Sequence, residues 1–161
     1  MSPLLRQGIH EPVTAPPSGG GMRRPIMLAT LAVPFDNDCA RVAIQAALEG
    51  SVKLIVVDAV ELPLWPQSLA TRHADLEHDA DRAAIQRLVA QTAALGIDVE
   101  HLRVRSPRPI EALLELAGER QAGLLVLGPD RSRIRPRLFR RAVKRIRKRA
   151  SCLLWVAGEG P

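Results

Sequence analysis

Short apolar runs alternate with longer segments of helical pattern along the chain, and this alternation constrains the fold more than any other feature. Runs rich in Val, Ile and Leu indicate strands buried on both faces, which is typical of a parallel sheet covered by helices. Right-handed crossovers between parallel strands make such a sheet doubly wound. The sequence therefore predicts an α/β fold in three layers, with a doubly wound sheet of five parallel strands and four helices.

Local signals indicate where these elements begin and end. Asp36, Asn37 and Asp38 can cap a first helix that ends near residue 49, and Gly50 and Gly96 are expected to stop the first and second helices. The predicted strands are 26–31, 52–58, 97–105, 123–127 and 152–157, and the later helices are 74–95, 109–120 and 136–149. Ligands of such sheets bind beyond the carboxyl ends of the strands. The loops at 32–36, 59–72, 106–108 and 128–135 are therefore the places to look for a site.

The first 24 residues differ from the rest of the chain. They hold four Pro and four Gly, and this composition disfavours regular structure. We expect a disordered leader over residues 1–24, with Met22 as an alternative start, and a single domain over residues 25–161.

Composition excludes several classes of protein. Only 2% of the residues are aromatic, which argues against nucleic-acid binding by base stacking. Cys39 and Cys152 cannot form a disulfide framework or a four-ligand zinc site by themselves. No apolar run reaches the roughly 18 residues of a membrane span, and no secretory signal is evident. We expect a cytoplasmic protein without a metal, a membrane partner or, since no catalytic constellation emerges, an enzymatic activity.

Basic charge is concentrated near the C-terminus. The formal net charge is +6, yet residues 131–149 alone hold nine Arg, two Lys and no acid. Apolar residues recur there at helical spacing and predict a stripe that packs on the sheet. The stripe consists of Leu138, Phe139, Ala142, Val143, Ile146 and Ala150. The opposite face is either a solvated helix surface or a patch for a polyanion such as nucleic acid or polyphosphate. The candidate patch residues are Arg140, Lys144, Arg145 and Lys148.

Three segments together resemble the universal stress protein family. The longest is LLVLGPDRSRIRPRLFRRAVKRIRKRASCLLWV, and the others are PIMLAT and LIVVDAVE. In that family a strand ends in Gly, and a loop, a helix, a small-residue link and a last apolar strand follow. The resemblance covers residues 25–157. It implies the fold that this family shares with adenine nucleotide alpha hydrolases, and a non-enzymatic role in stress response or regulation.

The resemblance also implies where a nucleotide would bind. ATP-binding members carry Gly, two residues, Gly, nine residues, Gly and then Ser or Thr, because phosphate oxygens must approach backbone N–H groups closely. Gly128 matches the first position, whereas Arg131, Arg141 and Ala142 occupy the other three. Two further positions are changed, because the family's Asp after the first strand falls on Leu31 and its loop Gly on Pro107. ATP bound in the family's usual manner is therefore not expected.

Two interpretations of the changed motif stay open. In one, Arg131 and Arg141 fill the phosphate space and pair with acids such as Asp130. In the other, arginine side chains hold a nucleotide or another phosphate ligand near Gly128 through bidentate hydrogen bonds. The candidate site residues are Thr30, Val57, Gly128, Arg131, Arg133, Arg141 and Ala142.

The last strand is a candidate dimer edge. Family members often pair this strand with a second copy, and an exposed apolar edge strand favours association. The predicted edge residues are Leu153, Leu154, Trp155 and Val156. The other interpretation is that Trp155 packs beneath the basic helix.

Overall fold

The computed structural model describes residues 23–62 and 71–158, with side chains described at 23–62 and 79–158. Residues 1–22 of the predicted leader, including Met22, lie outside the described residues. The strands are β1 (Ile26–Thr30), β2 (Leu54–Glu61), β3 (Val99–Ser106), β4 (Leu124–Leu127) and β5 (Leu153–Val156). The helices are α1 (Asn37–Gly50), α2 (Thr71–Ala94), α3 (Pro109–Glu119) and α4 (Pro136–Arg149). All nine predicted elements are thus confirmed in their predicted order.

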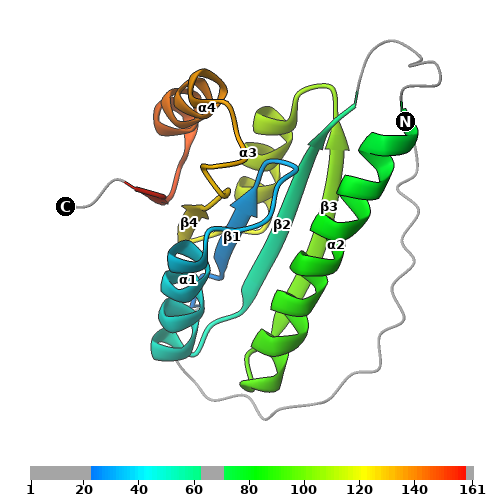
Figure 1. Ribbon diagram of the computed structural model, residues 1–161. Coiled ribbons are helices and arrows are strands. Elements are labelled where there is room, and N and C mark those ends of the chain that lie inside the picture. The colour runs from blue at the N-terminus through cyan, green and yellow to red at the C-terminus, as the bar shows by residue number, and fades with distance from the viewer. Residues whose placement is uncertain (1–22, 63–70, 159–161) are drawn as a thin grey trace, which may run out of the picture.

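The five strands form one parallel sheet of order β3-β2-β1-β4-β5 (Figure 1). The first strand, β1, lies at the centre of the sheet. The strands β2 and β3 lie on one side of it, and β4 and β5 lie on the other. The direction of winding therefore reverses between β1 and β4. In sheets of this kind the crevice at such a reversal, beyond the carboxyl ends of the strands, is the usual place for a ligand.

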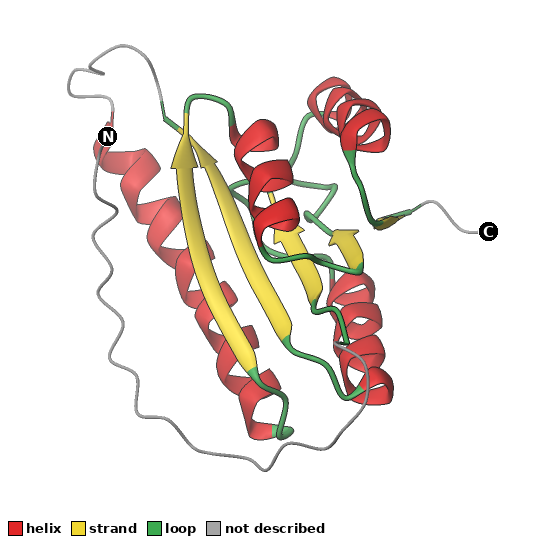
Figure 2. Ribbon diagram, turned by 180° about the vertical axis from the view of Figure 1, so that it is seen from behind, coloured by secondary structure: helices red, strands yellow, loops and turns green. Residues whose placement is uncertain are grey.

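Helices cover both faces of the sheet, as the three-layer prediction requires. Figure 1 views the face that α1 and α2 cover, and Figure 2 views the face that α3 covers. Residues of alternating orientation supply the two cores: Met27 and Ile55 pack with α3 and α4, whereas Leu28 and Val56 pack with α1 and α2. Burial on both faces explains why these strands are apolar throughout.

The ends of α1 confirm one predicted signal and correct another. The Asp36 carboxylate accepts hydrogen bonds from the backbone N–H groups of Asp38 (2.9 Å) and Cys39 (3.1 Å), as an N-cap should. Gly50, however, is the last helical residue, and the left-handed residue that ends the helix is Ser51, with φ 49°. Gly96 adopts a positive φ of 84° after α2, as predicted.

The second strand is longer than predicted, which shortens the following loop. Hydrogen bonding between β2 and β3 continues to the pair Glu61 and Ser106, so the predicted loop at 59–72 begins with strand. Its prolines, Pro63 and Pro66, lie outside the described residues. No helix in the described part of the chain is both long and apolar enough to cross a membrane.

A polar cluster interrupts the core beneath the paired strands β2 and β3. Asp58 and Arg103 are register partners, and Arg103 Nε lies 3.6 Å from Asp58 Oδ2. The Nε2 atom of His101 is buried without a hydrogen-bond partner among the described residues. Burial lowers the pKa of His101, opposed in part by the negative charge of Asp58 and helped by the positive charge of Arg103. Burial therefore favours the neutral form of His101.

The lowered pKa of His101 predicts that the folded chain is less stable in mild acid. Because its pKa is lower in the folded chain than in the unfolded one, the unfolded state binds more protons below about pH 6.5. The stability that depends on a neutral His101 is fully present above that pH. It is lost as the pH falls through the pKa of the folded chain. We expect the free energy of unfolding in urea to fall less between pH 7.5 and 5.5 in His101→Gln than in the parent chain. Equal pH dependence in the two chains would contradict this prediction.

Candidate functional site

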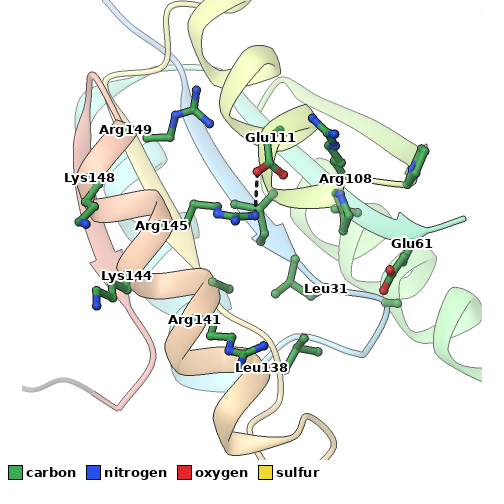
Figure 3. A pocket seen from close by; sticks show the side chains of 16 residues that line it. Leu31, Glu61, Arg108, Glu111, Leu138, Arg141, Lys144, Arg145, Lys148 and Arg149 are labelled. Carbon is green, nitrogen blue, oxygen red and sulfur yellow. Dashed lines mark hydrogen bonds and ion pairs between the residues drawn. The ribbon is translucent and has the colours of Figure 1, made fainter.

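A cleft opens at the carboxyl ends of β1, β2 and β3, between α3 and α4 (Figure 3). Its volume is about 690 Å³, which lies within the range typical of small-molecule sites. Leu31 and Ala32 follow β1, Ala59 and Glu61 come from the end of β2, and the start of α3 forms one wall. One face of α4 forms the opposite wall. The cleft therefore occupies the region that the topology favours for a ligand.

Positive charge dominates the walls of this cleft. The cationic residues are Arg108, Arg141, Lys144, Arg145, Lys148 and Arg149, and the acidic ones are Glu61 and Glu111. Arg145 Nη1 donates a hydrogen bond of 2.7 Å to Glu111 Oε1, which joins α4 to α3 across the cleft. Within the described chain the other five cations have no carboxylate at ion-pair distance. The cleft thus offers unpaired cations to an anionic ligand.

The floor of the cleft is apolar. Leu31, Ala59 and Ile110 contribute to it, and Leu138 adds an apolar side chain from α4. Leu138 is 53% exposed, which corrects its assignment to the core-facing stripe of α4. Phe139, Ala142, Val143 and Ile146 are buried against the sheet as predicted. An apolar floor beneath cationic walls suits a ligand with both a flat or aliphatic part and an anionic group.

The structure distributes the seven predicted nucleotide residues among different environments. Arg141 and Ala142 line the cleft. Thr30 is fully buried and donates its hydroxyl proton to the Val33 carbonyl (2.6 Å). Val57 is fully buried in the core beneath α3 and α4. The two residues of the family's third and fourth motif positions are therefore the ones that reach the cleft.

Gly128 packs tightly against α1. A Cβ atom at this position would overlap the Cβ of Cys39 and lie 3.1 Å from its Sγ. Its N–H donates to the Ala29 carbonyl (2.9 Å), and its own carbonyl accepts from the Asp36 N–H (2.9 Å). Burial, with the nearby charge of Asp36, raises the pKa of the Cys39 thiol to about 12. Burial therefore favours the neutral thiol of Cys39, which packs against Gly128.

Arg131 and Arg133 each have a partner that does not line the cleft. The Arg131 guanidinium lies over the ring of Phe139, 4.6 Å from its centre. Arg133 makes two hydrogen bonds to the carboxylate of Asp81 on α2, at 2.8 and 3.1 Å. Asp130, the acid considered as an arginine partner, instead accepts hydrogen bonds from the Ser132 N–H and hydroxyl. The structure does not bring the three arginines together around one point.

A second hollow, of about 500 Å³, lies on the other side of α4. It is lined by Arg131, Phe139, Arg140, Val143, Lys144, Arg147 and Lys148. All four predicted patch residues are exposed, and Lys144 and Lys148 line both hollows.

Sequence reasoning missed the cleft residue Glu111. The loop before α3 was among the predicted site loops. Glu111 follows that loop, but its ion-pair partner Arg145 is 34 residues away, so no local sequence pattern indicates the pair.

The predicted dimer residues lie on an edge strand with graded exposure. β5 is the last strand of the sheet, and Leu153 at its start is 74% exposed. Leu154 is half-buried, whereas Val156 is buried in the core. Trp155 packs with the core beneath α1 and α2, so the interpretation that it packs beneath the basic helix α4 is wrong.

The fold is that of an α/β protein with a doubly wound sheet, and the cleft lies at the carboxyl edge, where sheets of this class usually bind ligands. The model of the universal stress protein family matches residues 22–157, and the chain belongs to that family. No curated protein matches the chain.

Solved structures of the same family share the fold. A protein of the universal stress protein family from Burkholderia pseudomallei is 18% identical with a TM-score of 0.64, and the match covers 88% of this chain and 100% of that one. A universal stress protein from Archaeoglobus fulgidus is 22% identical, with a TM-score of 0.57 and coverage of 83% and 92%. A universal stress protein solved in complex with cAMP is 25% identical, with a TM-score of 0.57 and coverage of 85% and 98%.

Proposed function

We propose that this universal stress protein is a non-enzymatic regulatory domain that binds a small phosphorylated ligand in the cleft between α3 and α4. The observation that carries the proposal is the set of cations around an apolar floor. Arg108 comes from the start of α3, and Arg141, Lys144, Lys148 and Arg149 come from α4. Guanidinium groups bind phosphate through paired hydrogen bonds, so such side chains can replace a glycine-lined phosphate loop.

The state of the β4–α4 loop supports this replacement. A phosphate-binding loop needs backbone N–H groups that are free to point at the anion. Here the N–H groups of Gly128, Asp130 and Arg133 donate to backbone carbonyls, and that of Ser132 donates to the Asp130 carboxylate. These four N–H groups are thus already engaged, which supports a role for the side chains of the cleft in holding a phosphate.

The size and lining of the cleft favour a mononucleotide over inorganic phosphate. The apolar floor offers contact to a base, and the cationic walls offer contact to a phosphate. The universal stress protein that was solved with cAMP, at 25% identity, supports a nucleotide of this size. ATP held by the family's glycine motif is not part of the proposal, because Arg131 and Arg141 stand at two of its glycine positions.

A thermal-shift series with AMP, cAMP, ATP and adenosine tests the proposed ligand class. A nucleotide at 100 times its Kd stabilises the folded chain by about 2.7 kcal/mol, or several degrees in Tm. We expect this shift with a phosphorylated nucleotide and not with adenosine. We expect Arg108→Gln/Arg141→Gln to weaken binding at least tenfold, and Arg87→Gln, an exposed change on α2, to leave it unaltered. A shift of equal size with adenosine, or no shift with any nucleotide, would rule the proposal out.

The homodimer stays a proposal that β5 supports. Leu153 is the most exposed large apolar residue of the described chain and lies on the sheet edge. A lysine there would bring charge into an interface between two such edges. We expect Leu153→Lys to shift sedimentation from dimer to monomer at micromolar concentration. Leu95→Lys, which alters another exposed leucine after α2, is expected to keep the parent behaviour. A dimer that tolerates Leu153→Lys does not use this edge.

A further inference from the structure

Cations on α4 are arranged in three rows along the helix. The inner row faces the cleft and consists of Arg141, Arg145 and Arg149, whereas the outer row faces the second hollow and consists of Arg140 and Arg147. Lys144 and Lys148 line both hollows and form the crest between them. The helix thus presents a ridge with positive charge on both flanks, and a hollow lies along each flank.

Local helix energetics do not favour this arrangement. Like charges four residues apart, such as Arg140 with Lys144 and Lys144 with Lys148, repel each other on a helix surface. Arg137 lies in the first turn, at the positive end of the helix dipole, where a cation is unfavourable and no acid compensates it, whereas Arg147, Lys148 and Arg149 lie in the last turn, where the dipole favours them. Only the apolar stripe is needed to pack α4 on the sheet. The repulsion among cations at this spacing is thus a cost to the fold, and an anionic partner would relieve it.

We propose that α4 is a second binding surface, for the phosphate backbones of duplex DNA, which shares its inner row of cations with the cleft and adds the outer row. An α-helix with its side chains is about 10–12 Å across, and the major groove of B-DNA is about 12 Å wide and admits a helix. A helix in that groove has one phosphate backbone along each flank. Figures 1 and 2 both place α4 at a corner of the molecule, where a long partner can reach it.

The two-flank arrangement favours a duplex over other polyanions. A single phosphate chain, whether polyphosphate or single-stranded nucleic acid, meets cations along one line and leaves the other flank without a partner. Stacking of unpaired bases needs an exposed aromatic face, and Phe139, the aromatic residue of α4, is 3% exposed. The major groove of A-form RNA is too narrow for a helix. Phosphate contacts carry no sequence information, so we expect binding without sequence preference.

Salt-dependent binding to a 20-base-pair duplex of mixed sequence tests the surface. Each cation that contacts a phosphate steepens the fall of log Kobs with log salt by about one unit. We expect the outer-flank variant Arg140→Glu/Arg147→Glu and the inner-flank variant Arg141→Glu/Arg149→Glu each to weaken binding at least tenfold and to reduce the slope by about two. The control Arg41→Glu/Arg87→Glu changes the net charge equally on the side of α1 and α2, and should bind nearly as the parent chain does.

The variants also separate this surface from the cleft ligand. Arg140 and Arg147 do not line the cleft, so the outer-flank variant should lose duplex binding while a nucleotide still raises its Tm as in the parent. If only one of the two flank variants weakens duplex binding, the proposal is overturned in favour of a single phosphate chain. The same conclusion follows if polyphosphate binds more tightly than duplex DNA of equal charge. The proposal is also overturned if the control Arg41→Glu/Arg87→Glu loses as much duplex affinity as the flank variants, or if the parent chain does not bind duplex at 50 mM salt.

Discussion

Gly128→Ala is expected to lower the free energy of unfolding by about 3 kcal/mol, because overpacking a close-packed site displaces its neighbours. The added Cβ would overlap the Cβ of Cys39, and that atom is attached directly to the backbone of α1. It cannot rotate away as the end of a long side chain could. The strand β4 and the helix α1 would have to separate, which would also disturb the hydrogen bond from the Asp36 N–H to the Gly128 carbonyl. Urea denaturation measures the loss.

Matched variants distinguish this packing role from a role in ligand binding. Gly118→Ala, in an exposed part of α3 where a Cβ meets nothing within 4 Å, should stabilise the chain by up to about 1 kcal/mol. Cys39→Ala keeps the Cβ and should not rescue Gly128→Ala, whereas Cys39→Gly removes it and should recover part of the loss in a double-mutant cycle. If Gly128→Ala instead keeps the parent stability and loses only nucleotide binding, the glycine serves phosphate approach.

The elements were predictable because each has a local signal. Apolar runs marked the strands, Asp36 marked the start of α1, and Pro109 and Pro136 marked the starts of α3 and α4. The end of α1 was assigned to Gly50 because Gly most easily takes a positive φ, yet Ser51 takes it. The backbone N–H of Ser51 and of Val52 still reach carbonyls of the last turn, at 3.2 and 3.1 Å. A one-residue difference of this kind depends on tertiary packing.

The candidate site was predictable only in part, because its geometry depends on contacts between distant segments. The family motif pointed to Arg141 and Ala142, and both line the cleft. The hypothesis of arginine side chains around Gly128 also included Arg133, whose partner Asp81 is 52 residues away on another helix. Leu138 fitted the helical period of the stripe, but α4 turns it toward the cleft. Periodicity identifies the face of a helix, and it does not identify which neighbour, if any, covers each position on that face.

Arg103→Met is expected to cost about 3 kcal/mol of unfolding free energy, because it removes a cation from beside a buried carboxylate. Asp58 is 5% exposed, and the facing Arg103 Nε lies 3.6 Å from it. Removing one partner of a buried ion pair leaves the other charge in a medium that solvates it poorly. The Nε and Nη1 atoms of Arg103 have no hydrogen-bond partner among the described residues, so the attraction to Asp58 is expected to offset much of the cost of burying this guanidinium.

Replacing both charges separates the attraction from the packing. Asp58→Val/Arg103→Met puts an apolar, β-branched residue into the strand and leaves no charge to desolvate, so it should be more stable than Arg103→Met alone. Arg41→Ala breaks an ion pair with Asp38 whose side chains are both 74% exposed, and such pairs contribute at most about 1 kcal/mol. A loss for Arg103→Met no larger than that for Arg41→Ala would mean that Asp58 is held by its other contacts. The ion pair between Asp58 and Arg103 would then result from the register of β2 and β3 and would not stabilise that register.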